Sequence, residues 1–426
     1  MTDCTFIGID VGTSGVRAVL IDDNGKFLGA ASSSMDSHGD NRRDPWVWWA
    51  ATDTVLRELS VLCKSNSDIP VAAVCVDGTS GTMLPIDSAG NPLADALMYN
   101  DQVTDSAVLS KIANCAPLES AVHGATSALG RAITLQTTPG AVNVVHQADW
   151  IAGRISGTFT LSDESNALKT GYDPVQRCWP DWLADSGIDI SKLPVVVPAG
   201  AVTGYVTSAA AIEYGLNETT SVVAGVTDGC ASFLATRASK VGDCVTALGT
   251  TITMKMLCDK PLFKPQYGIY SHRIGDHWLA GGASNSGGSV LAQYFSNEEI
   301  TDLSAQINPE IEAPFQYYPL TCPGERFPHS DANWPPVVSP RPKKQSEFLH
   351  CLLEGMAMIE SLGYKRLSEI GAPEMRSMRT VGGGAINEAW TAIRKRCLKV
   401  KFQQSFSTEA AMGVALLARD SYISDK

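Results

Sequence analysis

The sequence lacks the cysteine spacing of a zinc site or a disulfide framework. Its 11 cysteines are odd in number and spread along the chain without a Cys-x-x-Cys pair, so we expect reduced, mostly buried thiols. No apolar run approaches the roughly 18 residues that a membrane-spanning helix needs, and the first residues lack the charged and apolar regions of a secretory leader. These absences predict a cytoplasmic protein without a membrane anchor.

Basic residues are also fewer than acidic residues. The chain has 33 Lys and Arg against 45 Asp and Glu, a formal net charge of −12 and a pI of about 5.1. This balance argues against a broad surface for nucleic acid or anionic membrane, so an anionic ligand has to be met by local donors and metal. With 426 residues, 44% hydrophobic and 18% charged, the composition is that of a soluble globular protein of about two to three domains.

The most informative motif lies near the beginning of the chain. Two apolar segments, 6–9 and 16–21, flank the turn Asp10-Val11-Gly12-Thr13-Ser14-Gly15. Glycine lets backbone approach a polyphosphate, hydroxyls and N–H groups donate to its oxygens, and a carboxylate can hold the accompanying Mg²⁺. The alternative is an ordinary hairpin with a glycine-rich turn.

Two further apolar segments deliver polar residues at their ends. Residues 71–76 read as a buried strand that ends in Asp77-Gly78-Thr79-Ser80-Gly81-Thr82, and residues 221–226 read as another that leads into Thr227-Asp228-Gly229 before a helix. α/β proteins place ligands at such strand ends. Asp228 as a simple helix N-cap, and Thr79 and Ser80 as simple strand terminators, are the alternatives.

The second half repeats the opening pattern. Residues 243–254 again read as strand, Gly-Thr-Thr turn and strand, which suggests two related halves. Residues 378–390 predict a strand, the turn Gly382-Gly383-Gly384 and a helix start, where a flat ring can lie against backbone. The proline-rich residues 314–342 predict a long surface excursion, and residues 408–419 a core helix.

In this order the motifs resemble the actin/Hsp70/sugar-kinase ATPases and, more closely, the FGGY family of carbohydrate kinases. The matching segments run nearly from end to end of the chain: Asp10-Val11-Gly12-Thr13-Ser14, Tyr99-Asn100-Asp101, residues 163–171, residues 225–229, Leu248-Gly249-Thr250-Thr251, residues 324–328, Glu354-Gly355, and Gly382-Gly383-Gly384-Ala385 with Asn387.

The resemblance implies roles for matched residues only. Asp228 would be the catalytic base that accepts the sugar hydroxyl proton, and Asp10 would lie near Mg²⁺ and the transferred phosphate. The phosphates of ATP, the co-substrate, would bind to the turns at 12–14 and 249–251. The adenine would bind to Gly383, Gly384, Asn387 and Trp390, although a tryptophan in a helix is often a core residue. The nucleotide-binding residues implied in this way are Gly12, Thr13, Ser14, Gly249, Thr250, Thr251, Gly383, Gly384, Asn387 and Trp390.

The implied fold is α/β and two-lobed, the actin-like (ribonuclease H-like) ATPase fold, with a mixed sheet flanked by helices in each lobe and closure that excludes water. The sugar-binding N-terminal lobe would span residues 1–235 and regain the C-terminal helix 409–426. The adenine-nucleotide-binding C-terminal lobe would span residues 236–408. The sequence leaves monomer and dimer open.

The 77–82 loop narrows the expected substrate. Xylulose kinases of the family usually carry Gln-Met-His-Gly there, and this loop has no histidine; the Arg-Glu pair of glycerol kinases is also absent. Asp-x-Thr-Ser looks closer to the compact ribulose-kinase-like branch. The expectation is D-ribulose phosphorylated at its terminal hydroxyl, contacted by Ser80, Asp10 and Asp228, with D-xylulose or another sugar or polyol as alternatives. An ATP-binding chaperone or sugar-responsive binding protein is the alternative from another class.

Overall fold

The computed structural model describes residues 4–65 and 69–424. Within them the chain divides into two compact units. Unit one comprises the described residues of the ranges 1–235, 272–275 and 409–426, and unit two comprises residues 236–271 and 276–408. No helix among the described residues is both long enough and apolar enough to cross a membrane.

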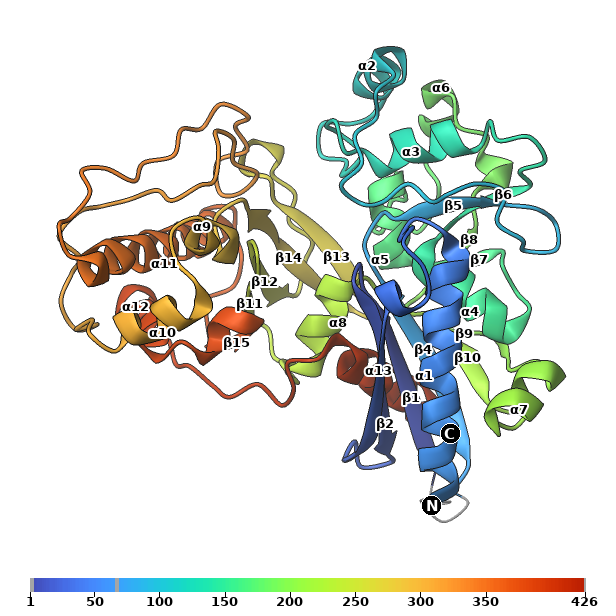
Figure 1. Ribbon diagram of the computed structural model, residues 1–426. Helices are drawn as coiled ribbons and strands as arrows, with labels where there is room; N and C mark the ends of the chain where they lie inside the picture. Colours follow the sequence, from blue (N-terminus) through green and yellow to red (C-terminus); the bar gives the residue numbers. More distant parts are fainter. Residues whose placement is uncertain (1–3, 66–68, 425–426) are drawn as a thin grey trace. The chain divides into compact units, whose positions relative to one another are not determined.

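The main sheet of unit one has six strands in the order β3-β2-β1-β4-β10-β9 (Figure 1). β1 pairs antiparallel with β2 and parallel with β4, and β4 pairs parallel with β10. β1, β2, β4 and β10 form because the apolar runs predicted from the sequence are buried on the sheet. Their bounds are β1 Thr5–Val11, β2 Gly15–Asp22, β3 Phe27–Ser34, β4 Val71–Gly78, β9 Val202–Tyr205 and β10 Ser221–Val223.

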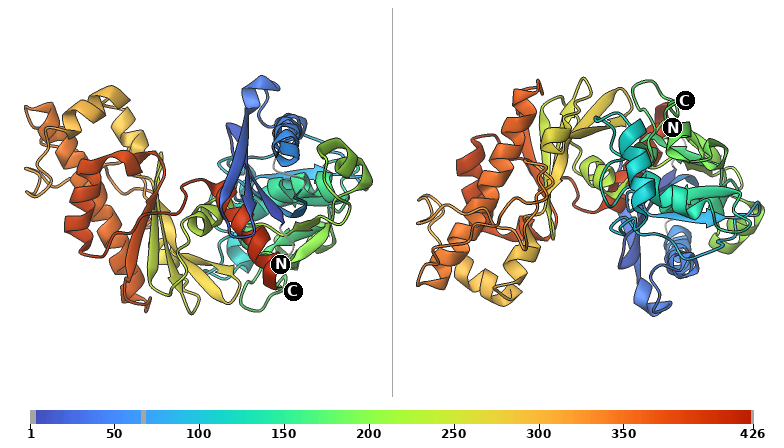
Figure 2. Two further views of the ribbon diagram at one scale, coloured as in Figure 1. Left: turned by 90° about the horizontal axis from the view of Figure 1, so that it is seen from below. Right: turned by 90° about the horizontal axis from the view of Figure 1, so that it is seen from above.

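Helices and two small sheets complete unit one. The C-terminal helix α13 returns to pack against β1, β4 and α8, and Figure 2 shows it beside the N-terminal strands from two further directions. The small-sheet strands are β5 Met83–Ile86, β6 Asn143–His146, β7 Leu161–Asp163 and β8 Val195–Val197. The helices are α1 Pro45–Ser65, α2 Ser106–Cys115, α3 Ala128–Leu135, α4 Gln147–Ser156, α5 Glu164–Ala167, α6 Leu183–Ser186, α7 Ser208–Tyr214, α8 Asp228–Ala235 and α13 Ala410–Ser424.

The second large sheet has five strands, in the order β13-β14-β12-β11-β15. Its hairpin β11/β12, the antiparallel neighbour β14 and the parallel neighbour β15 repeat the arrangement of β1/β2, β3 and β4. The two related halves expected from the sequence are therefore confirmed at the level of topology. The bounds are β11 Asp243–Leu248, β12 Ile252–Cys258, β13 Tyr270–Ile274, β14 His277–Ser284, β15 Ser377–Val381, α9 Gly288–Ala292, α10 Asn297–Ser304, α11 Gln345–Glu369 and α12 Glu388–Leu398.

The proline-rich segment 314–342 contains no helix or strand, as its sequence predicts. The expectation of a surface excursion was wrong for part of it. Phe327 is fully buried in the hydrophobic core of unit two, and Glu325 is 3% exposed. Proline prevents regular structure but does not prevent burial, because the freed backbone groups here find local partners such as the Glu325–Asp331 bridge.

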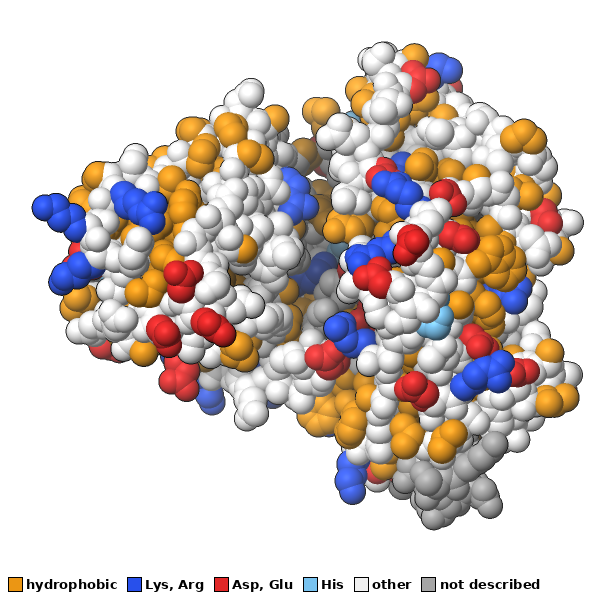
Figure 3. Space-filling model, viewed as in Figure 1, with side chains coloured by type: hydrophobic (Ala, Val, Ile, Leu, Met, Phe, Trp, Pro, Cys, Tyr) orange, Lys and Arg blue, Asp and Glu red, His pale blue; other side chains and the backbone are white. Residues whose placement is uncertain are grey.

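The cysteines and the surface agree with the composition. All 11 cysteines are free thiols, as their spacing predicts. On the face drawn in Figure 3, acidic and basic side chains are interspersed and do not gather into a basic patch.

Candidate active site

Three aspartates from separate segments meet at the carboxyl edge of the main sheet of unit one. Asp10 on β1 pairs in parallel register with Asp77 on β4. The next residue of β4, Gly78, bridges in parallel to Thr227, which directly precedes Asp228. The order of the strands therefore brings the predicted base and the predicted metal-binding aspartate to one edge.

Asp77 joins this site although its carboxylate was not among the predicted site residues. It is fully buried, and neither oxygen accepts a hydrogen bond from an N–H or O–H donor among the described residues. Asp10, its register partner on β1, and Asp228 are the neighbouring carboxyl groups that raise its pKa. Ionising both of two neighbouring carboxyls that are largely removed from water is costly, which favours keeping a proton on one of them.

The electrostatics follow from this arrangement. Burial, together with the nearby charge of Asp228, raises the pKa of Asp10 to about 6, although the hydrogen bond from Asp77 and the charge of Arg17 oppose the rise. Burial first, and then the charges of Asp10 and Asp228, raise the pKa of Asp77 well above its usual range.

A pH-dependent stability follows from the raised pKa values. Between pH 4 and the folded-state values, the folded protein holds protons that the unfolded chain has released, so the free energy of unfolding falls as pH rises through about 6. The shift in the pKa of Asp10 from 3.8 to about 6 corresponds to about 3 kcal/mol.

We expect Asp77→Asn to raise the free energy of unfolding at pH 7 by about 1–3 kcal/mol and to leave it unchanged at pH 4. Urea denaturation without nucleotide or divalent cation measures both values. The exposed Asp40→Asn is the control; equal effects of both variants, or of Asp77→Asn at both pH values, would contradict the assignment.

Asp228 is the first residue of α8. The alternative interpretation made Asp228 the N-cap, but Asp228 already belongs to the helix and so follows the N-cap position. Its Oδ1 accepts a hydrogen bond from the N–H of Gly229 at 2.7 Å. The same residue supports the start of the helix and presents a charge beside Asp10 and Asp77.

The 77–82 loop connects β4 to β5 and is held tightly. The N–H and hydroxyl of Thr79 donate to Gln147 Oε1 at 3.0 and 2.8 Å, and the hydroxyls of Thr79 and Thr82 lie 2.6 Å apart. The Ser80 hydroxyl is buried and has no hydrogen-bond partner among the described residues. Ser80 is thus the hydroxyl of this loop whose hydrogen-bonding capacity is not used by the protein itself.

The two predicted phosphate turns occupy equivalent places in their own units. In unit one the Gly12 N–H donates to Gly15 O, and Thr13 and Ser14 are exposed. In unit two Gly249 and Thr250 are exposed. Thr251 completes that turn, since its carbonyl accepts from Gly249 N–H, and the first residues of α9 donate to the carbonyls of Gly249 and Thr250.

The predicted adenine residues divide into an exposed turn and a buried support. Gly383 is exposed and Gly384 half-buried. Asn387 is the N-cap of α12, its Oδ1 accepting from Trp390 N–H at 2.9 Å. Trp390 is only 2% exposed and lies directly beneath Gly384, where a Cβ would come within 2.6 Å of its ring. The indole therefore supports the turn from the core instead of facing solvent.

The segment 163–166 supports Asp228 from the side. Asp163 accepts four hydrogen bonds from Ser165 and Asn166, and the Ser165 hydroxyl accepts from the Thr227 N–H at 2.9 Å. The Asp-Glu-Ser-Asn-Ala string marked the family resemblance, but nothing local in the sequence connects it with Thr227, 62 residues away.

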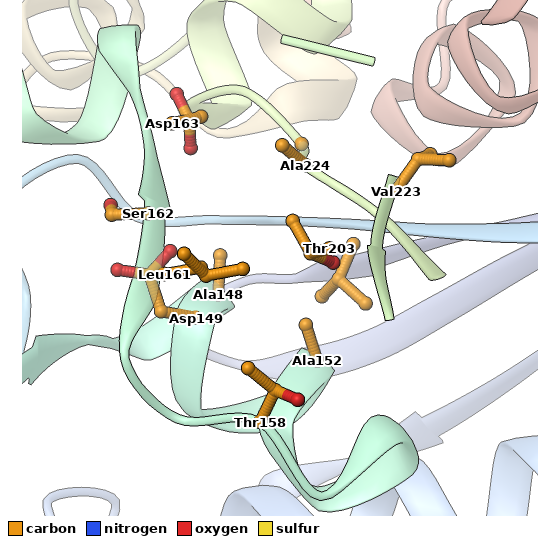
Figure 4. Close-up of a pocket in the computed structure, with 12 residues that line it drawn as sticks. Ala148, Asp149, Ala152, Thr158, Leu161, Ser162, Asp163, Thr203, Val223 and Ala224 are labelled. Carbon is orange, nitrogen blue, oxygen red and sulfur yellow. The ribbon is translucent and has the colours of Figure 1, made fainter. Parts of the chain in front are cut away.

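A small pocket next to this segment is not a sugar site. Its volume is about 20 Å³, and its polar lining comes from Asp149, Thr158, Ser162, Asp163 and Thr203 (Figure 4). That is room for about one water molecule. The adjacent His146 is buried and bonded to Asp149, Ser162 and Thr170, which makes it a structural histidine.

The comparisons with known proteins decide the family. Residues 5–120 and 135–235 match the model of the N-terminal domain of the FGGY family of carbohydrate kinases, and residues 244–419 match the model of its C-terminal domain. The chain belongs to this family. It is an FGGY carbohydrate kinase that uses ATP as co-substrate.

Individual relatives of this FGGY kinase are distant. A xylulose kinase of Escherichia coli is 25% identical over 96% of this chain and 88% of its own, and a gluconokinase of Bacillus subtilis is 22% identical over 90% and 81%. The crystal structures of a gluconate kinase from Lactobacillus acidophilus and a xylulose kinase from Rhodospirillum rubrum superpose with TM-scores of 0.85 and 0.84, at 18% and 21% identity. Both alignments cover 99% of this chain and 89% and 90% of the other, so the two-lobed sugar-kinase fold, of the actin-like ATPase type, is confirmed.

Proposed function

We propose that this kinase phosphorylates D-ribulose at its terminal hydroxyl, giving D-ribulose 5-phosphate and ADP, with Asp228 as general base. The observation that carries the proposal is the meeting of Asp10, Asp77 and Asp228 at one sheet edge, directly beside the Asp-x-Thr-Ser loop. The proposal assigns the sugar to unit one, residues 1–235 with 409–426, and the nucleotide to residues 236–408.

The charge of the site supports a neutral acceptor. Around Asp10 the negative charges that raise its pKa are those of Asp228 and Glu409, opposed by the positive charge of Arg17. A substrate carboxylate placed there would meet net repulsion, because like charges a few ångströms apart in a partly buried site are costly. A sugar acid such as gluconate is therefore disfavoured in spite of the gluconokinases among the relatives.

The proposed chemistry needs few groups. Asp228 accepts the proton of the terminal hydroxyl as that oxygen forms its bond to the γ-phosphorus, and the bond from phosphorus to the β,γ-bridging oxygen breaks to release ADP. Ser80 binds a sugar hydroxyl, and Asp10 orients the acceptor end. Gly12, Thr13 and Ser14, and in unit two Gly249, Thr250 and Thr251, donate to phosphate oxygens. Gly383, Gly384 and Asn387 border the adenine, with Trp390 beneath them.

The residues present also fit Mg²⁺. Asp77 offers two buried carboxylate oxygens that have no hydrogen-bond partner among the described residues, Asp10 lies beside it in register, and Mg²⁺ prefers such hard oxygen ligands. No group of three or more His, Cys, Asp or Glu in the described residues is spaced to hold a metal alone, which suits an ion held by one or two carboxylates plus substrate phosphates. When bound, Mg²⁺ would neutralise phosphate charge, and Asp10 is the residue proposed to hold it.

A panel of acceptors tests the substrate. With Mg-ATP, we expect kcat/KM for ADP formation to be highest with D-ribulose and at least about tenfold lower with D-xylulose, L-ribulose, glycerol and gluconate, since one mismatched hydroxyl in a polar site commonly costs a factor of this size or more. D-Xylulose is the second candidate, because several relatives are xylulose kinases. A higher kcat/KM with D-xylulose would overturn the D-ribulose assignment and leave the kinase in place.

A further inference from the structure

Arg131 of α3 is a buried cation whose partners are all backbone. It is 2% exposed. Its Nε and Nη2 donate to Gly81 O at 3.1 and 2.8 Å, and its Nη1 donates to Asp101 O and Thr126 O, both at 3.0 Å. No carboxylate among the described residues forms an ion pair with it: the charge of Asp101 acts on it, but that carboxylate is paired with Arg43. Burying a guanidinium without a direct ion-pair partner is costly. We therefore expect its hydrogen bonds to backbone carbonyls, which an apolar side chain could not form, to have a functional role.

The contacts show which parts of the chain Arg131 holds. Gly81 lies in the 77–82 loop, which carries Ser80. Asp101 ends the Tyr99-Asn100-Asp101 motif, and Thr126 precedes α3. Gly81 has a φ of +85°, a conformation that favours glycine, and a Cβ there would come within 2.9 Å of Arg131 Nη2. The loop backbone thus bends so that one carbonyl receives two guanidinium N–H groups.

Gln147 of α4 holds the other residues of the same loop. Its Oε1 accepts from Thr79, and its backbone N–H donates to Thr82 O at 3.0 Å. Thr79, Gly81 and Thr82 are therefore all anchored, whereas Ser80 between them keeps an unpartnered hydroxyl. An anchored loop with one unpartnered hydroxyl is the arrangement expected of a preorganised ligand contact.

We propose that Arg131 is a positioning residue for sugar binding, which fixes the 77–82 loop through Gly81 so that Ser80 meets the acceptor in a defined place. The proposal rests on the proposed function in one respect only, that this loop binds the sugar. It does not depend on which sugar is phosphorylated, and the best acceptor of the panel serves as the probe.

The expected kinetic signature is selective. Arg131→Met removes every donor at similar length, so the loop loses its anchor. KM for the sugar then rises about tenfold, because the hydrogen bond of Ser80 to the sugar is weakened and such a bond contributes about that factor to affinity. KM for ATP stays unchanged, because the proposed nucleotide turns are elsewhere in the chain. The value of kcat changes less than about threefold, since the hydrogen bonds of Arg131 go to Gly81, Asp101 and Thr126 and not to the proposed base. Arg131→Lys keeps one donor group and gives an intermediate KM. In Arg131→Ala, guanidinium chloride well below denaturing concentrations restores a KM near that of the wild type, and methylammonium chloride does not.

Two controls separate positioning from general destabilisation. Leu59→Ala, in the buried core of unit one, is expected to lower the melting temperature while leaving KM for the sugar unchanged. Ser80→Ala tests the loop's role in sugar binding directly. A wild-type sugar KM in a folded Arg131→Met or Arg131→Lys variant, a parallel rise in KM for sugar and ATP, or a rise of equal size in Leu59→Ala would overturn the proposal. If Ser80→Ala raises KM and Arg131→Met does not, the positioning proposal fails and the proposed function stands; if neither raises KM, the loop does not bind the sugar.

Discussion

Asp228→Asn is expected to lower kcat by about 10² to 10⁴, the usual contribution of a general base, while the affinity for ATP stays within about twofold of the wild type. The amide has nearly the shape of the carboxylate, and its oxygen still accepts the hydrogen bond from Gly229 that the start of α8 uses. The variant therefore loses the proton acceptor without losing the helix. Stopped assays of sugar phosphate formation, with nucleotide binding measured by calorimetry, check both halves of the prediction.

The control for Asp228→Asn removes a different negative charge near Asp10. Glu409 contributes to the potential at Asp10 but has no proposed contact with the acceptor, so Glu409→Gln should change kcat by less than about tenfold, the size of an ordinary electrostatic perturbation. Equal losses in the two variants would assign the effect to general charge. Loss of ATP binding together with unfolding in Asp228→Asn would instead make Asp228 a structural residue of the helix start.

Arg394→Met is expected to reduce the free energy of unfolding by about 3–5 kcal/mol, because it leaves a buried carboxylate without its counter-ion. Arg394 is fully buried and forms two hydrogen bonds with Glu360, at 2.6 and 2.7 Å. Glu360 also accepts from Thr246 at 2.6 Å, and Arg394 donates to Thr380, two residues before the glycine turn at 382. Denaturant titration measures the loss, and KM for ATP is expected to rise as well because the turn loses this support.

The matched double variant makes this prediction sharper. Arg394→Met with Glu360→Leu removes both charges, and replacing a buried ion pair by apolar side chains is often close to neutral. The double variant should therefore recover most of the stability that Arg394→Met loses, whereas Arg376→Met at an exposed position should change stability by less than about 0.5 kcal/mol. A double variant as unstable as the single one would show that the pair contributes by packing and not by charge compensation.

Much of the fold could be predicted because its signals are local. The apolar runs around the turn at 12–14 predict the β1/β2 hairpin, and the buried runs at 71–76 and 221–226 place their polar ends at the carboxyl edge of a parallel sheet. The repeat of strand, Gly-Thr-Thr turn and strand predicts the second half in the same way. Each of these depends on the alternation or continuity of neighbouring residues, which the sequence displays directly.

The contacts that complete the site could not be predicted from such signals. Asp77 becomes important because the register of β1 and β4 places it against Asp10, 67 positions away. Arg131 and Gln147 are single polar residues in helices, and only tertiary structure shows that they hold one loop. Trp390 lies in a helix pattern that does not distinguish a ligand-facing ring from a core ring, and the structure buries it.

The most direct test of the account follows the transferred phosphate. Wild-type enzyme, Mg-ATP and D-ribulose are mixed, and the phosphorus products are identified by ³¹P NMR. ADP and D-ribulose 5-phosphate are expected in equal amounts, with little ADP when the sugar is omitted. Inorganic phosphate in place of a sugar phosphate, a phosphate on another oxygen, or a rate of ADP formation that does not depend on D-ribulose would contradict it.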